Sequence, residues 1–351
     1  MNRRRALVRM GGLAAAVAGE LAPWPRTAGA VPAAAPVFPP GAVIRTLFGD
    51  LRPGTLAGGT TLFHEHLNLP STLPPDQTAA MVRSAMSHGV RCIVDGGHAD
   101  MQRSVAVLRD ISRQTGVHVV GSAGYHYERF HPPELARLDE EQIAEGLVRE
   151  VRQEHLGAFG EIAESNDGPM TALEQKVFRA VGRAHVLTGL PIFTHTAYGT
   201  GPRVPKDAGL RQLDLLERAG VDPRHVAIGH LCCHDEPDAA TLKAIAKRGA
   251  FVGFDRVTGG LVPDAQKVRT IQAFLDAGYA EHLLLSTDFT GKRTANGAGE
   301  VPMSTPLDYA ITLTTFVPKL RAAGVPAEIL RAITQDNPRR FLAFVPRSAG
   351  L

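Results

Sequence analysis

Several histidines and carboxylates of this 351-residue chain lie where they could bind divalent metal ions together. The stretch TLFHEHL places two imidazoles two residues apart, and the other candidates each close a short apolar run. The full set is His64, His66, Glu161, His195, His230 and Asp288. Imidazole nitrogens and carboxylate oxygens are ligands for zinc, manganese, cobalt and iron. A buried structural role would explain any one of the 14 histidines, so the hypothesis depends on whether the fold brings the set together.

Four neutral imidazoles and two carboxylates are more ligands than one tetrahedral zinc ion uses. The set therefore predicts two metal ions that share a bridging ligand. Such a pair lowers the pKa of a bound water molecule and polarises a carbonyl or phosphoryl oxygen, which is the chemistry of hydrolysis. We expect two divalent ions in each chain, with zinc as the first choice.

Short apolar or β-branched runs alternate with segments of helical periodicity from residue 44 onward. Eight strands are predicted, at residues 60–66, 90–97, 117–125, 156–163, 190–196, 225–231, 250–256 and 282–288. This alternation favours a single-domain α/β fold, the (β/α)8 TIM barrel. A doubly wound open sheet is the alternative, but no glycine-rich phosphate-binding turn follows the first strand.

The candidate ligands all fall at the carboxyl ends of predicted strands, which is where a TIM barrel gathers its active site. Residues i and i+2 of a strand share a face, so His64 and His66 should both point into the barrel. Glu65, between them, should point toward the surrounding helices. The two histidines therefore predict one half of a metal site at the barrel mouth.

The first 30 residues have the composition of an export signal. An arginine cluster at residues 3–5 precedes a Gly/Ala-rich apolar stretch that ends in Ala28-Gly29-Ala30. This pattern is typical of a twin-arginine signal, cleaved near Ala30, and predicts a periplasmic protein. A disordered basic leader or an uncleaved anchor is the alternative. Residues 31–43 predict a Pro/Ala-rich spacer, so the metal-dependent hydrolase barrel would span residues 44–351.

Charge and cysteine content exclude some classes of partner. Removal of the leader would take away five arginines and one glutamate and change the formal charge from +3 to −1. No basic stripe with interleaved aromatic residues remains, so we expect no nucleic-acid partner, and nothing predicts stable membrane insertion after signal removal. Cys92, Cys232 and Cys233 are predicted to be buried free thiols.

Six segments together resemble the phosphotriesterase family of the amidohydrolase superfamily. They are TLFHEHL, IVDGGHADMQR, LPIFTHTA, HVAIGHL, LLLSTD and ITQDNPRRFL, in the family's order. The resemblance implies that His64, His66 and Asp288 hold the more buried metal ion and that His195 and His230 hold the more exposed one. It also implies that Asp288 accepts the proton when a metal-bridging hydroxide attacks the substrate.

The bridging position is where members of this family differ. Many use a carboxylated lysine, whereas the segment GAFGEIAESNDGP offers Glu161, as in the subgroup of phosphotriesterase homology proteins. Glu164 is the competing candidate, but it should face the opposite side of an extended strand.

Two departures from the strongest triesterases bear on the substrate. Cys233 replaces the aspartate expected three residues after His230, and His234 or Asp235 could serve the proton relay only if the loop bends differently. Arg256 matches the lactonase-like branch, and Asp255 is expected to orient it. The resemblance therefore favours hydrolysis of a small-molecule ester or lactone, with Asp288 and Arg256 as catalytic residues.

Other functions stay open at this point: phosphotriester hydrolysis, amide (C–N) hydrolysis within the same superfamily, or a non-catalytic exported ligand-binding barrel. A homodimer is a further hypothesis. Asp100 and Arg103 are expected to pair at the start of a helix. Candidate contacts with the substrate are Tyr125, His126, Tyr127 and Lys292.

Overall fold

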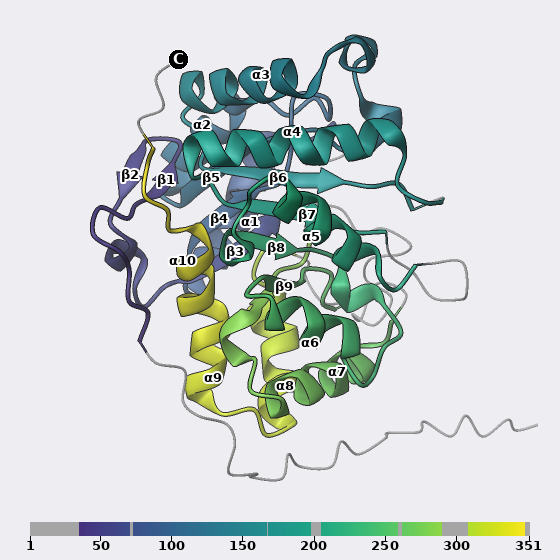
Figure 1. Cartoon of the computed structure of the whole chain (residues 1–351). Coiled ribbons are helices and arrows are strands. Elements are labelled where there is room, and N and C mark those ends of the chain that lie inside the picture. The colour runs from purple at the N-terminus through teal and green to yellow at the C-terminus, as the bar shows by residue number, and fades with distance from the viewer. Residues whose placement is uncertain are drawn as a thin grey trace, which may run out of the picture.

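The computed structural model describes residues 35–70, 73–166, 168–197, 205–258, 262–289 and 308–347, and its centre is an eight-stranded parallel sheet (Figure 1). The strands follow one another in chain order: β3 (Thr60–Glu65), β4 (Val90–Asp95), β5 (His118–Ala123), β6 (Ala158–Ala163), β7 (Ile192–His195), β8 (Val226–Ile228), β9 (Phe251–Phe254) and β10 (Leu283–Leu285). The prediction of eight strands in a (β/α)8 TIM barrel is confirmed. The predicted export signal and Lys292 lie outside the described residues.

The first and last strands meet beside the predicted ligands. The Asp288 N–H donates to the His64 carbonyl at 3.2 Å, and the His66 N–H donates to the Phe289 carbonyl at 3.1 Å. The His64 N–H donates to the Ser286 hydroxyl, which lies 222 residues away in the chain. Because these contacts join the two ends of the sheet, the strands form a barrel. The alternative of an open doubly wound sheet is wrong.

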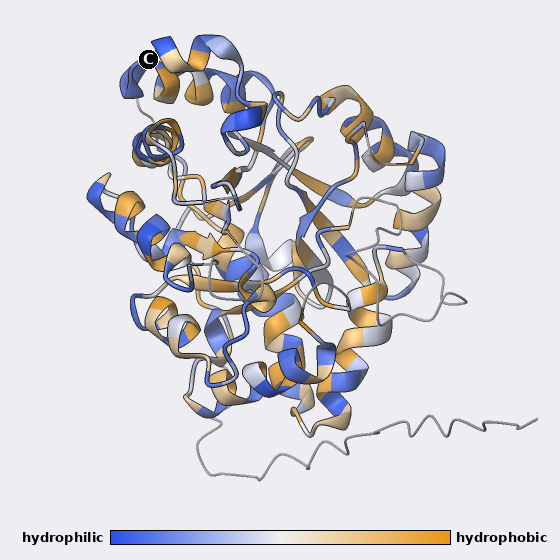
Figure 2. Cartoon of the chain, turned by 90° about the vertical axis from the view of Figure 1, so that its right-hand side faces the viewer, coloured by the Kyte–Doolittle hydropathy of each residue, from blue (hydrophilic) through white to orange (hydrophobic). Residues whose placement is uncertain are grey.

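Helices follow the strands along the chain and surround them, with hydrophobic and hydrophilic residues on each helix (Figure 2). They are α1 (Pro75–Ser87), α2 (Val105–Thr115), α3 (Glu140–Gln153), α4 (Ala172–Thr188), α5 (Ala208–Arg218), α6 (Ala240–Lys247), α7 (Asp264–Asp276), α8 (Val317–Ala322), α9 (Ala327–Arg331) and α10 (Asn337–Leu342). Single π-helical turns at Thr312–Phe316 and Ala332–Asp336 precede α8 and α10. Short 3-10 turns lie at Pro53–Leu56, Glu128–Phe130, Pro133–Arg137, Pro223–His225, Leu231–Cys233 and Ala280–His282.

The helix starts follow local sequence signals. Asp139 and Thr171 each form a capping box, in which the N-cap side chain accepts from the third helical N–H and the Gln142 or Glu174 side chain accepts in return. This exchange satisfies backbone donors that a helix start otherwise leaves unpaired. Helices α3 and α4, which precede and follow β6 in the chain, therefore begin at defined residues.

The lower level of the barrel interior is apolar and receives side chains from every strand. Its members are Phe63, Cys92, Val94, Val120, Ala158, Phe193, Ala227, Phe251 and Leu284. Phe341 of α10 and Ile44 of the hairpin formed by β1 (Ile44–Thr46) and β2 (Gly49–Leu51) complete this cluster. A larger apolar cluster fills the space between the strands and the helices. The amino end of the barrel is therefore closed by packed side chains.

Two strands depart from regular register just where this apolar level ends. Pairing of β3 with β4 shifts between Leu62 and Glu65, and pairing of β6 with β7 shifts between Phe159 and Ile162. Such an extra residue re-aims the side chains beside it. In β6, Ala158 faces the interior and both Phe159 and Ile162 face the helices. Strict alternation from Ala158 would turn Glu161 outward, so the shift is what turns it inward.

The three cysteines are buried free thiols, as predicted. Cys232 Sγ and Cys233 Sγ lie 3.6 Å apart. Among the described residues, no helix has both the length and the apolar character needed to cross a membrane.

Candidate metal centre

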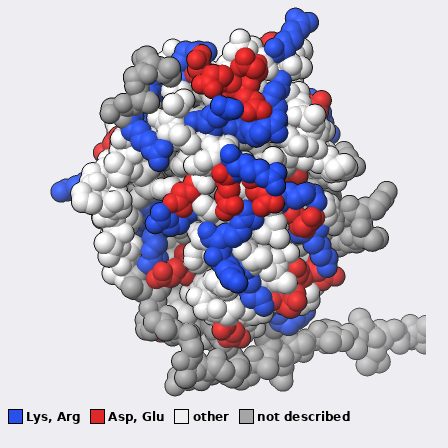
Figure 3. All heavy atoms as spheres, in the orientation of Figure 1, with Lys and Arg blue, Asp and Glu red and all other residues white. Residues whose placement is uncertain are grey.

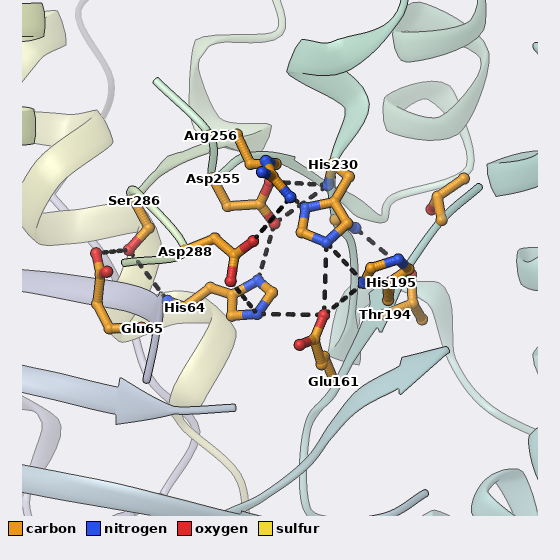
Figure 4. Close-up of polar contacts among 12 residues, drawn as sticks. His64, Glu65, Glu161, Thr194, His195, His230, Asp255, Arg256, Ser286 and Asp288 are labelled. Atoms are coloured by element: carbon orange, nitrogen blue, oxygen red, sulfur yellow. Dashed lines mark hydrogen bonds and ion pairs between the residues drawn. The ribbon is translucent and has the colours of Figure 1, made fainter. Parts of the chain in front are cut away.

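The six predicted ligands converge at the carboxyl end of the barrel, and Figure 4 labels all of them except His66. They come from the ends of five strands: His64 from β3 and His66 directly after it, Glu161 from β6, His195 from β7, His230 two residues past β8, and Asp288 three residues past β10. The backbones of His230 and Asp288 have φ of 58° and 49°. Residues other than glycine rarely adopt this left-handed conformation, and where they do it often marks a functional site.

Glu161 lies in the middle of the group. Its Oε1 is 3.1 Å from His66 Nε2, and its Oε2 is 2.8 Å from His195 Nδ1. Oε2 is also 3.4 Å from the Nε2 atoms of both His64 and His230. The carboxylate thus lies among all four histidines, which is a position that suits a bridging ligand.

Asp288 lies on the β3 side of Glu161. Its Oδ1 is 3.0 Å from His66 Nε2 and 3.8 Å from His64 Nε2. One nitrogen or oxygen from each of His64, His66, Glu161 and Asp288 can be chosen so that all four atoms lie within 4.8 Å of one another. His64 Nε2 is buried and has no hydrogen-bond partner in the part of the chain that the structure describes. A divalent cation among these four donors would satisfy that nitrogen, so the residues fit a metal site.

Burial and charge act in opposite directions on these groups. Burial lowers the pKa of His66, but hydrogen bonds to Asp288 and Glu161 outweigh it and raise the pKa to about 10. Burial likewise lowers the pKa of His230, and Asp255 and Glu161 raise it to about 10. Burial raises the pKa of Glu161, but the surrounding histidines hold it well below its usual range. Protons and metal ions would compete for these imidazoles, so metal binding must weaken at low pH.

Asp255 was assigned too small a role by the sequence prediction, which had it orient Arg256. Its carboxylate is fully buried and lies between two of the ligands: Oδ2 is 2.9 Å from His64 Nδ1, and Oδ1 is 2.9 Å from His230 Nδ1. Holding both Nδ1 atoms leaves both Nε2 atoms directed at Glu161. Carboxylates that fix metal-binding histidines in this way strongly affect affinity. Its position directly after β9, at the same end of the barrel as the ligands, was the available signal.

Arg256 contacts the centre from the side opposite His66. Its Nη1 is 3.3 Å from Asp288 Oδ2, while Asp288 Oδ1 faces His66. Burial raises the pKa of Asp288, but the His66 hydrogen bond and the charges of His64 and Arg256 hold it below its usual range. Arg256 therefore fixes the orientation of the Asp288 carboxylate.

Glu65 points away from the interior, as predicted, but it is fully buried. Its Oε1 accepts hydrogen bonds from the Ser286 hydroxyl and the Thr287 N–H, and its Oε2 accepts from the Phe289 N–H at 2.8 Å. Burial raises the pKa of Glu65 to about 7 despite these bonds. Glu65 thereby holds the segment that carries Asp288.

Glu164, the competing bridge candidate, does not join the ligand groups. Its Oε1 accepts from the Ala197 N–H at 3.1 Å, and its own N–H donates to the His195 carbonyl. Glu164 supports the end of β7 from outside the barrel interior.

The residues that could replace the missing proton-relay aspartate are tied elsewhere. His234 Nε2 is 2.9 Å from the Ala197 carbonyl, and the exposed Asp235 accepts from Gln266. Cys233 is buried against Cys232. The bend that would bring His234 or Asp235 to the centre is absent from this loop.

The predicted substrate contacts separate into two groups. His126 and Tyr127 have rings 5.0 and 6.0 Å from that of His195, so both border the centre. Tyr125 instead packs on the outer apolar cluster and meets His131 edge to face. Burial lowers the pKa of His126 to about 3, so its imidazole is neutral.

The expected pair of Asp100 and Arg103 is wrong. Asp100 Oδ1 lies 3.3 Å from His98 Nδ1, and Asp100 Oδ2 accepts the His126 N–H at 2.8 Å. Arg103 donates to the Gly97 and Ser122 carbonyls and to Glu150. The helix-start argument failed because buried carbonyls and the loop after β5 offered nearer partners.

Comparison with known proteins identifies the family of this fold and site. The family model described as "Phosphotriesterase family" matches residues 44–342. The phosphotriesterase homology protein of Escherichia coli (strain K12) is 32% identical over 81% of this chain and 97% of its own length. Its crystal structure, described as complexed with phosphate in the active site, superposes with a TM-score of 0.72 at 31% identity, covering 81% of this chain and 99% of that one.

More distant relatives carry different activities in their names. An aryldialkylphosphatase of Saccharolobus solfataricus is 26% identical over 81% of this chain and 95% of its own length. An N-acetyltaurine hydrolase of Danio rerio is 24% identical over 86% of this chain and 98% of its own length. With a family model that matches nearly all of the barrel, a relative above 30% identity and a strand-end cluster of metal ligands, the chain belongs to the phosphotriesterase family, as a metal-dependent hydrolase.

Proposed function

We propose that this protein is a binuclear metal-dependent hydrolase that acts on a small-molecule ester or lactone. The observation that carries the proposal is the position of the Glu161 carboxylate among the histidines: Oε1 faces His66 and Oε2 faces His195. Glu161 lies within 3.4 Å of all four histidines, so its carboxylate is within reach of both groups of ligands. Glu161 would therefore serve as the bridge.

His64, His66 and Asp288 would hold the more buried ion, and His195 and His230 the more exposed one. Two such ions, with zinc as the first choice, would activate a water molecule and polarise the oxygen of a substrate carbonyl. Asp255 keeps His64 and His230 in the orientation that this role needs.

Asp288 would accept the proton that the attacking water loses. Arg256 contacts Oδ2 of Asp288, which leaves Oδ1 toward the ligands. A general base must lie within hydrogen-bond reach of the proton that it removes, and Oδ1 would satisfy this condition for a water molecule bound beside it in the centre. Arg256 is 19% exposed at its side chain, so it could also contact the substrate at the mouth.

The choice of a carbonyl substrate rests on the loop after β8. Cys233 occupies the position of the relay aspartate, and His234 and Asp235 have partners away from the centre. A triesterase mechanism that depends on this relay would therefore have a cysteine, Cys233, in place of the relay aspartate. The relatives named as a phosphatase and as an N-acetyltaurine hydrolase make phosphotriesters and amides the substrates to compare.

The test combines metal analysis with a substrate panel. Purified protein would be analysed for bound metal and then assayed on lactones, aryl esters, phosphotriesters and N-acyl amides. Two ions per chain and the highest kcat/KM on an ester or lactone are expected. Fewer than one metal ion in active protein would contradict a binuclear centre, and a higher kcat/KM on phosphotriesters or amides would overturn the substrate class.

We also propose that residues 1–30 direct export to the periplasm. Amino-terminal sequencing of the protein from a periplasmic extract should begin near Val31. Recovery of the intact leader in the cytoplasm would contradict export.

A further inference from the structure

His126 lies three residues past the end of β5, beside the exposed half of the centre. One nitrogen of its ring lies within 4.8 Å of ligand atoms of both Glu161 and His195. The His126 and His195 rings meet edge to face, with centroids 5.0 Å apart and planes at 84°. We propose that His126 is a further protein ligand of the exposed metal ion, which would then be held from four consecutive strands, β5 to β8. This inference rests on the proposed binuclear function.

The imidazole of His126 is available for such a role. The residue is 6% exposed, and its Nδ1 is buried with no hydrogen-bond partner among the described residues. Buried polar nitrogens nearly always have a partner, so an unpartnered nitrogen on a ring that borders Glu161 and His195 needs an explanation. A cation bound by this ring and shared with Glu161 and His195 would provide one.

The backbone of His126 is held at both of its polar groups. Its N–H donates to Asp100 Oδ2 at 2.8 Å, and its carbonyl lies 2.6 Å from His131 Nε2. Asp100 is buried in turn and lies beside His98. Ligands that are fixed by outer hydrogen bonds in this way bind metals more tightly, because less freedom is lost on binding.

The adjacent aromatic residue does not have the same features. The Tyr127 ring lies 6.0 Å from that of His195, and the Arg129 guanidinium lies over it at 4.9 Å from the ring centroid. Tyr127 therefore suits the wall of a substrate pocket, whereas His126 adds a neutral nitrogen donor and leaves the charge of the centre unchanged.

The first test is a titration of metal-free protein with Co²⁺ alone, followed by calorimetry and by visible absorption. In His126→Phe, the first ion should bind as in the wild type and the second should bind more weakly, by roughly tenfold or more, since even outer-shell changes cost 10- to 100-fold. His118→Gln, at the opposite end of β5, is the matched control and should leave both affinities unchanged.

The second test places a different ligand at the same position. His126→Cys should give a thiolate-to-cobalt charge-transfer absorption when the second Co²⁺ binds. The wild-type protein is the control, because its three buried cysteines should give no such absorption. This variant also tests the proposal if His126→Phe fails to fold.

The outcomes separate the two proposals. Wild-type affinity for the second Co²⁺ in His126→Phe, with no charge-transfer absorption in His126→Cys, would overturn the role of His126, and a raised KM alone would make it a substrate contact. Binding of only one ion by the wild-type protein would overturn the binuclear function itself, and the ligand role of His126 in the exposed position with it.

Discussion

The two levels of the barrel interior differ in how they are built. The lower level takes apolar side chains from all eight strands, and its one register shift, between Thr60 and Thr61, brings in no polar ligand. The upper level holds the ligands, and there β3 and β6 shift register while His230 and Asp288 adopt left-handed backbone conformations. Apolar packing does not depend on which atom a side chain presents, whereas convergence of six polar ligands needs backbone departures that aim particular atoms. Stability and metal binding should therefore respond to different substitutions.

Removal of a large side chain from the lower level should reduce stability and leave the centre intact. Phe251 packs in this level against Phe341, with ring centroids 5.7 Å apart. We expect Phe251→Ala to lower the free energy of unfolding of the metal-free protein by about 3–5 kcal/mol, as measured by urea denaturation. Phe48→Ala, at a 53% exposed phenylalanine, is the control and should change it by about 0.5 kcal/mol or less. Loss of bound metal from folded Phe251→Ala would show that the levels are coupled.

Substitution of Glu161, the proposed bridge, should instead reduce metal binding and leave the fold intact. Glu161→Gln keeps the shape of the side chain but removes the charge between the histidines. Metal content should fall from two ions to one or fewer, and kcat/KM should fall by more than about 100-fold, beyond the effect of an outer-shell partner. Circular dichroism of the metal-free variant should match the wild type. Two ions bound at full activity would remove Glu161 from the bridge.

Asp255 should show a smaller effect on metal affinity than a direct ligand does. Asp255→Asn should weaken the contacts of this side chain with the Nδ1 atoms of His64 and His230. We expect affinity for both ions to fall by roughly 10- to 100-fold in chelator competition. Asp110→Asn, on the exposed face of α2, controls for loss of a negative charge. Equal affinities in the two variants would assign Asp255 to packing alone.

Glu164, which supports the end of β7 from outside the barrel interior, should make the stability of the metal-free protein depend on pH. Burial raises the pKa of Glu164 from 4.5 to about 7, so the folded state keeps this proton where the unfolded state has lost it. Its contribution is complete below pH 4.5 and is lost as the pH rises through 7. Relative to Glu164→Gln, metal-free wild type should lose about 1–2 kcal/mol between pH 5 and 7. A slope remains in the variant because Glu65 also has a pKa of about 7. Identical slopes in both proteins would contradict the raised pKa of Glu164.

The sequence predicted the barrel and the convergence of the ligands because strand-helix alternation and strand-end position are local patterns. It could not predict that Glu161 turns inward through a register shift, since nothing in AFGEIA marks the extra residue. Nor could it find the role of Asp255, because a contact with two histidines from other strands is set by the closed ring. Asp100 was paired with the wrong residue for the same reason: its partners, His98 and the His126 N–H, depend on the path of the loop after β5.

The surface seen in Figure 3 mixes acidic and basic side chains over the outer helices, without one large area of either charge. Exposed pairs such as Arg113 with Asp110 contribute little stability at such positions. The charges that matter to function are the buried ones at the barrel mouth.

The junction of β3 and β10 links folding to activity. The hydrogen bonds that close the ring run between His64 and Asp288 and between His66 and Phe289, over 220 residues apart in the chain. Contacts of such long range come late in folding, because the entropy of closing the loop must be lost before they form. A growing chain released before β10 would contain five of the six ligands and still have no closed centre. Recovery of catalytic turnover during refolding would therefore report ring closure itself, and a lag between burial of the core and return of turnover would time that last step.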